Sequence, residues 1–257
     1  MPPCQSRSIS RSGVIRVADD PTRHLTPATH VAEIPENGYY DWTSVLDYFS
    51  PSFWLFEVVK ELTHVDVLEE LLAPVSGHWE QVSEYGDALN KLSLCLTGTC
   101  QNMNEATNAI RPEWKGNAAD AAFRYFDSAA ASLDGYAKVL AALQVQYKDV
   151  ARQMWTNCEA VKAIAEQILD DALFAAIAVT AGTVTAQTGA GPLIGYGLAA
   201  LKIVSMLERI HEGTKVVRVG KALIDGLTST SEVLSKQMQD IRQVPPIKAA
   251  YDHPAVR

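Results

Sequence analysis

The chain has 257 residues, 47% of them hydrophobic and 20% charged, which are the proportions of a folded soluble protein. Its formal net charge is -8, and residues 31–207 carry more than twice as many acidic as basic side chains. Because nucleic-acid binding requires a basic patch, this acidic middle argues against a nucleic-acid partner.

The N-terminal third carries two predicted segments. Residues 1–37 mix Ser, Arg and Pro without an apolar run, so they predict a disordered lead-in and no conventional signal peptide. Residues 38–74 concentrate aromatic side chains and predict short helices over 50–62 and 65–72, the second ending before Pro74.

A heptad repeat is the strongest pattern in the sequence and predicts a long antiparallel helical hairpin over 75–171. Large side chains recur every seven residues on each side of a break at 111–117. This predicted seam consists of Val82, Leu89, Leu96, Met103 and Ile110 before the break, and Phe126, Leu133, Leu140, Tyr147 and Met154 after it. Thr97–Gly98–Thr99 predicts a kink in the first helix.

The segment 172–244 is predicted to be Ala/Gly-rich and helical, with no charged residue from Ala172 to Leu201. One interpretation is a buried hairpin in which small residues pack closely; the other is a hairpin that enters a membrane. Each arm is shorter than a bilayer-spanning helix. A basic helix is expected after Gly213, a last helix capped by Ser229, and a frayed tail over 245–257.

We find no residue pattern typical of catalysis. The pairs His64–Asp66 and His78–Glu80 are two residues apart, a spacing that points side chains in different directions on a helix. The cysteines have no neighbouring His and predict apolar fillers or free thiols. The sequence therefore predicts an all-α, non-enzymatic protein with no metal and no cofactor.

The break between the two long helices contains Trp114, Lys115 and Gly116. Gly can take a positive φ at such a turn, while Trp fills the space where the helices separate. A Trp-x-Gly turn centred in a heptad hairpin resembles the WXG-motif family of type VII (ESX, early-secreted-antigen-like) secretion substrates. The flanking segments resemble its longer actinobacterial subgroup.

This resemblance implies partners and a location. It implies a homodimer, or a heterodimer with a sister WXG protein, and recognition by the type VII secretion ATPase. The chain would be secreted without a conventional signal peptide, and cytoplasmic before export. Because no toxin domain follows Arg257, we expect a free-standing secreted protein or the delivery half of a split system.

One feature of the family is altered. In the family a Tyr and an acidic residue four positions later follow the turn as a secretion signal, whereas Tyr136 and Tyr147 are followed by Leu140 and Ala151. Trp155 and Glu159 have the required spacing and are the candidate variant signal. The alternative is that Trp155 is a packing residue.

Two other functions stay open. The uncharged 172–201 hairpin predicts a membrane-inserting protein, with membrane contact through this segment. The altered signal predicts instead an intracellular helical scaffold that is never exported.

Overall fold

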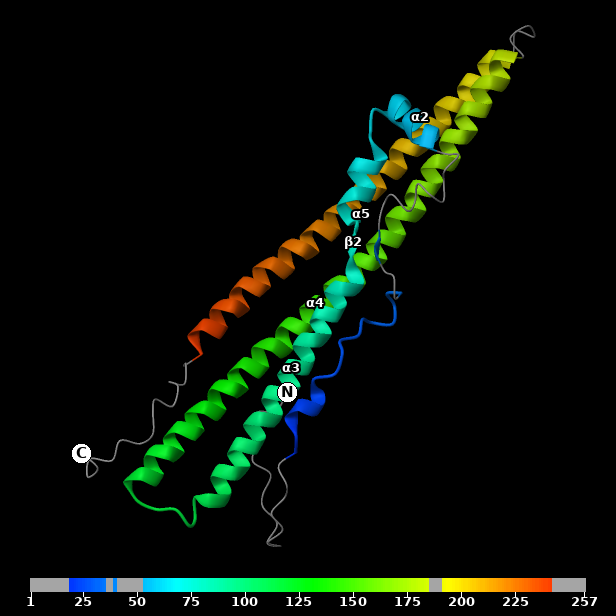
Figure 1. Ribbon diagram of the computed structural model, residues 1–257. Helices are drawn as coiled ribbons and strands as arrows, with labels where there is room; N and C mark the ends of the chain where they lie inside the picture. The colour runs from blue at the N-terminus through cyan, green and yellow to red at the C-terminus, as the bar shows by residue number, and fades with distance from the viewer. Residues whose placement is uncertain (1–18, 36–38, 41–52, 185–190, 242–257) are drawn as a thin grey trace. The chain divides into compact units, whose positions relative to one another are not determined.

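The computed structural model describes residues 19–35, 39–40, 53–184 and 191–241, and over these residues the fold is all-α, as predicted. Three long helices dominate it: α3 (Trp79–Ile110), α4 (Asn117–Val184) and α5 (Gly191–Asp240) (Figure 1). The shorter elements are η1 (Pro21–His24), β1 (Tyr39–Tyr40), α2 (Phe53–Thr63), η2 (Leu68–Leu72), η3 (Ala73–Val75) and β2 (Gly77–His78). The two short strands pair antiparallel.

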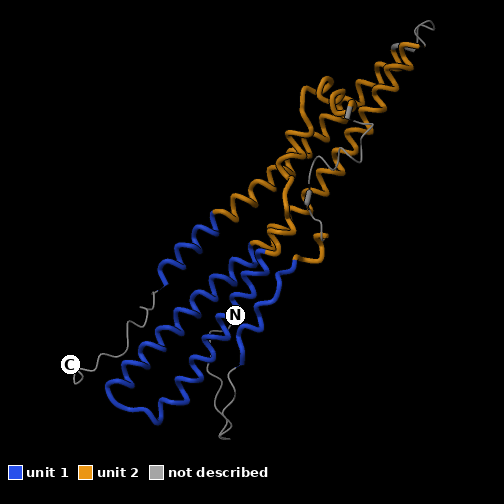
Figure 2. The backbone as a smooth tube through the Cα atoms, in the orientation of Figure 1, with its two compact units in different colours: residues 1–29, 85–146, 229–257 blue, residues 30–84, 147–228 orange. Residues whose placement is uncertain are grey.

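The chain divides into two compact units (Figure 2). Unit 1 comprises residues 1–29, 85–146 and 229–257, and unit 2 comprises residues 30–84 and 147–228. Each of the three long helices contributes residues to both units.

Unit 1 is built on the predicted hairpin, in which α3 and α4 run antiparallel. The Ser93 hydroxyl donates to the carbonyl oxygen of Ala137 at 2.7 Å, and the Cys100 thiol donates to that of Ala130 at 3.4 Å. These two contacts are seven residues apart on both helices. The side chains of one helix therefore reach the backbone of the other, which requires small residues at the interface.

The centre of this interface differs from the predicted seam. On α3 the buried positions that recur every seven residues are Gly86, Ser93, Cys100 and Thr107, which we call the small-residue seam together with Ala130 and Ala137 on α4. Each of the four follows a predicted seam residue by four positions, about 40° around the helix.

The large residues of the predicted seam consequently lie beside the interface. Leu89, Leu140 and Met154 are buried and Ile110 is exposed. The other members are half-buried: Val82, Leu96, Met103, Phe126, Leu133 and Tyr147. The buried positions at the centre of the hairpin also follow a seven-residue period, but on α3 they are shifted by four positions from the predicted seam.

The prediction of a disordered lead-in is wrong for residues 19–35. In unit 1 the side-chain amide of Asn102 donates to the carbonyl oxygen of Asp19 at 2.7 Å, and the backbone N–H of Thr29 donates to the Asp87 carboxylate at 3.0 Å. In unit 2 Ile34 is almost completely buried. The polar composition of residues 19–35 gave no indication that this segment forms hydrogen bonds with α3. The rest of 1–37 lies outside the described residues.

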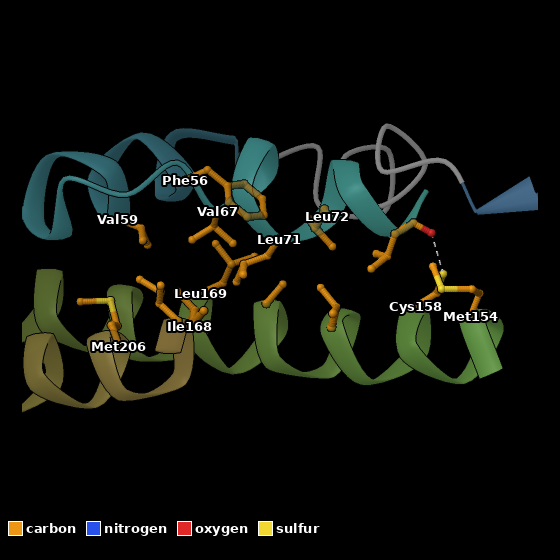
Figure 3. Packing of buried hydrophobic residues seen from close by; sticks show 14 of the residues in the cluster. Phe56, Val59, Val67, Leu71, Leu72, Met154, Cys158, Ile168, Leu169 and Met206 are labelled. Carbon is orange, nitrogen blue, oxygen red and sulfur yellow. Dashed lines mark hydrogen bonds between the residues drawn. The ribbon is translucent and has the colours of Figure 1, made fainter. Parts of the chain in front are cut away.

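The core of unit 2 is formed where α2 and η2 lie against α4 and α5. Figure 3 shows Leu71 and Leu72 of η2 pointing toward Ile168 of α4, with Met206 of α5 on the same side. All four side chains are fully buried. Unit 2 thus covers the apolar side of α4 with its own later and earlier segments.

Several predicted helix boundaries are wrong because the helices continue through them. The boundary at 171/172 falls inside α4, and both Gly213 and Ser229 fall inside α5. α3 continues through Gly98, where a kink and not a boundary was predicted. The chain also stays helical through Pro74, in the 3₁₀ turn η3. Parts of the predicted short-helix region (41–52) and the predicted tail (245–257) lie outside the described residues.

Candidate functional site

The Trp-x-Gly turn joins α3 to α4 in unit 1, and Gly116 has the conformation expected of it. Its φ is +104°, a value that side-chain-bearing residues rarely adopt. A Cβ at this position would meet nothing within 4 Å, so the requirement for Gly comes from the backbone alone. The N–H of Asp120 then donates to the Gly116 carbonyl oxygen at 3.0 Å as α4 begins.

An ion pair and an aromatic contact hold this turn together. Arg111 donates to both oxygens of Asp127 at 2.9 and 3.0 Å, and its guanidinium lies 4.7 Å from the centre of the Phe123 ring. Trp114 packs edge-on against Phe123, with ring centroids 5.6 Å apart. Lys115 donates to the carbonyl oxygen of Arg111 at 2.9 Å. Sequence reasoning missed Arg111 and Asp127, whose spacing of 16 residues follows no local rule.

Trp114 only partly fills the space between the helices, because 41% of its surface is exposed. Its indole contacts the ring of Phe123, which is itself buried. An exposed aromatic at the end of a hairpin is available to a partner chain.

The candidate variant signal lies on α4 within unit 2. Trp155 is half-buried and packs against the main core of that unit, whereas Glu159 is exposed. Trp155 thus has a packing role, and its part in a secretion signal stays a prediction. The same geometry leaves part of the indole and the whole carboxylate accessible one helical turn apart.

An apolar stripe follows α3 in unit 1, beside the small-residue seam. Leu92 and Ile110 are 41% and 43% exposed, and Leu96 and Met103 between them are half-buried. On the helix these four side chains fall within about 40° of one another. This α3 stripe is the kind of surface that a further amphipathic helix covers in a bundle.

The structure brings one of the two His–acid pairs into contact. His78 and Glu80 do meet, with Nδ1 and Oε1 3.2 Å apart, which corrects the prediction that they point apart: α3 begins only at Trp79. Asp66 is held by Lys60 at 2.7 Å rather than by His64. Among the described residues no group of three or more His, Cys, Asp or Glu could hold a metal ion.

Cys158 shows why the thiols are structural. Burial raises the pKa of the Cys158 thiol to about 12, and the thiol donates to the carbonyl oxygen of Val75 at 2.9 Å. It therefore stays protonated and unreactive at neutral pH. Cys95 and Cys100 do not form a disulfide with each other, and an unbroken α3 keeps them apart as predicted.

A charged cluster fixes α4 to α5 in unit 2. Asp171 is buried and accepts hydrogen bonds from Lys202 at 2.6 Å, Ser205 at 2.7 Å and Arg209 at 3.0 Å. Burial alone raises the pKa of Asp171, but the three hydrogen bonds outweigh it and hold the pKa below its usual value. The carboxylate is therefore ionised at neutral pH.

No protein-family model matches the chain, and neither a curated protein nor a solved structure matches it. Of the described helices, α4 is long and apolar enough to cross a membrane, a property that core helices of soluble proteins share.

Proposed function

We propose that the chain is a non-enzymatic interaction protein that is exported by a type VII secretion apparatus. It acts by packing its hairpin against the helix pair of a partner. The observation that carries this proposal is the Trp-x-Gly turn. Gly116 has the left-handed φ of +104°, and Trp114 stands partly exposed beside it at the end of a long antiparallel hairpin.

The α3 stripe supports packing against a partner. Leu92 and Ile110 are exposed although they belong to the apolar repeat of α3, and the small-residue seam already satisfies the hairpin itself. This stripe lies on the hairpin that carries the Trp-x-Gly turn, so we place the binding site of a second copy or a sister WXG protein on unit 1.

Export is the decisive test. The intact protein is measured in the culture filtrate of an actinobacterial host with an active secretion ATPase and with an ATPase that cannot hydrolyse ATP. We expect the protein outside the cells only when the ATPase is active. An equal amount inside the cells in both strains, with none outside, would contradict export and favour the intracellular scaffold.

The same assay locates the signal. We expect Trp155→Ala and Glu159→Gln to reduce export, and Glu159→Gln to do so without lowering the total amount of protein, because Glu159 is exposed whereas Trp155 packs against the core. Trp54→Ala and Glu208→Gln are matched controls, because Trp54 and Glu208 are exposed on other helices of unit 2. Export of all four variants at the wild-type level would show that Trp155 and Glu159 are not the signal.

A further inference from the structure

The uncharged part of unit 2 packs α4 against α5 through backbone contact. A Cβ on Gly195 would lie 2.6 Å from the carbonyl oxygen of Ala178 and 2.7 Å from the Cα of Gly182. Ala175, Ala178 and Ala199 form the buried cluster here. The space between the helices therefore holds small residues only, and every large side chain must point outward.

We call residues 172–184 and 191–201 the apolar tip. Of the 23 exposed large hydrophobic side chains among the described residues, ten lie in it, and Val184, Leu193 and Leu201 are 76%, 79% and 68% exposed. At 100° per residue, the exposed positions cover about 220° of the circumference of α4 and about 200° of that of α5. The outer surface of the tip is thus mostly apolar; the exposed Thr180 and Thr183 interrupt it, and their hydroxyls donate to backbone carbonyl oxygens of α4.

Charge ends abruptly at the base of the tip. Residues 172–201 contain no Asp, Glu, Lys or Arg, and the residues on either side of this segment are Asp171 and Lys202. These two are bonded to each other at 2.6 Å. The helix pair is therefore fixed by an ion pair at the boundary between its charged and uncharged parts.

We propose that the apolar tip inserts into the hydrocarbon region of a lipid bilayer as a closed helix pair. A groove on a protein partner would cover one side of the pair, whereas apolar side chains here surround it and only a surrounding apolar phase covers them all. Helices satisfy their own backbone hydrogen bonds, and small residues are the contact that helices use inside lipid.

The length of the tip limits the depth to which it can enter the bilayer. The 13 residues of α4 from 172 to 184 extend about 20 Å at 1.5 Å per residue. The hydrocarbon core of a bilayer is about 30 Å thick. The tip therefore enters one leaflet and passes the middle without crossing, and Asp171 and Lys202 stay at the level of the headgroups. Insertion is a property of the purified chain and is independent of its route of export.

Flotation of the full-length protein with phosphatidylcholine vesicles tests the proposal. Neutral lipid is chosen because the net charge of -8 opposes anionic surfaces. We expect the wild-type protein to rise with the vesicles and Leu193→Asp and Ile194→Asp, which place a charge deep in the inserted part, to reduce the floating fraction at least tenfold. Val219→Asp is the matched control, since Val219 is 55% exposed on α5 outside the tip.

Helical circular dichroism confirms that the variants are folded, and sedimentation without lipid measures self-association. A wild-type protein that stays at the bottom of the gradient overturns insertion. Flotation of both Asp variants at the wild-type level overturns it too, since another surface would then bind lipid. If the protein does not float and Leu193→Asp abolishes its self-association, the tip is covered by a second copy instead.

Discussion

Gly195 and Gly197 offer a matched test of the close helix contact in unit 2. Both lie on α5 two residues apart, and replacing either with Ala adds the same methyl group and the same gain in helix propensity, about 1 kcal/mol. At Gly195 the new Cβ would lie 2.6 Å from a backbone oxygen, whereas at Gly197 it would meet nothing within 4 Å.

The expected difference between the two variants follows from this geometry. A backbone oxygen cannot rotate away, so α4 and α5 must separate locally, which costs about 1–3 kcal/mol for overpacking. Because the propensity gain cancels in the comparison, Gly195→Ala should open the apolar tip more easily than Gly197→Ala by that amount. This corresponds to a factor of about 5–150 in the opening equilibrium.

Hydrogen exchange measured by mass spectrometry reports this opening for each peptide. Amides in 173–184 and 195–201 should exchange faster in Gly195→Ala by that factor, and peptides around the Trp-x-Gly turn should exchange equally in both variants. Equal protection of the tip in the two variants would refute the close contact of α4 with α5.

Three further predictions concern the turn, the small-residue seam and the thiols. Gly116→Val should lower the free energy of unfolding by about 1–3 kcal/mol, because Val is strained at positive φ, and an unchanged melting temperature would count against it. Ala137→Leu should lower the free energy of unfolding, measured in urea, by about 1–3 kcal/mol, because Ala137 is buried between the helices. Ala142→Leu should leave it nearly unchanged, because Ala142 is exposed. At pH 8 a thiol reagent should modify half-buried Cys95 in the folded protein and Cys158 only after unfolding; rapid reaction of Cys158 would show that its thiol is not buried.

The heptad period was predictable, but the centre of the hairpin was not. Large apolar residues such as Leu96 and Met103 give the strongest periodic signal, so sequence reasoning places them at the interface. The interface centre is formed by Ser93 and Cys100, which have the same period but little hydrophobicity. A seven-residue repeat of small residues, four positions after the large ones, was the signal that could have located it.

Glycine and capping residues misled the prediction of helix ends. Gly213 lies inside α5, and its lack of a side chain serves packing, because a Cβ there would lie 2.9 Å from a side-chain carbon of Leu71. Glycine inside a helix costs about 1 kcal/mol relative to alanine, and tertiary packing outweighs this cost. The exposure of the apolar tip likewise could not be read from composition, because a buried hairpin and a lipid-facing hairpin share the same small and apolar residues.

The native mass of the protein tests most directly whether it acts through a partner. The tagged chain is purified from its own host under mild conditions and measured by size-exclusion chromatography with light scattering. Leu92→Glu is compared with Gln101→Glu, because Gln101 is exposed about 180° away on α3. The account predicts a complex with itself or a second hairpin protein that Leu92→Glu disrupts and Gln101→Glu preserves. A wild-type particle of 28.0 kDa at micromolar concentration would contradict it.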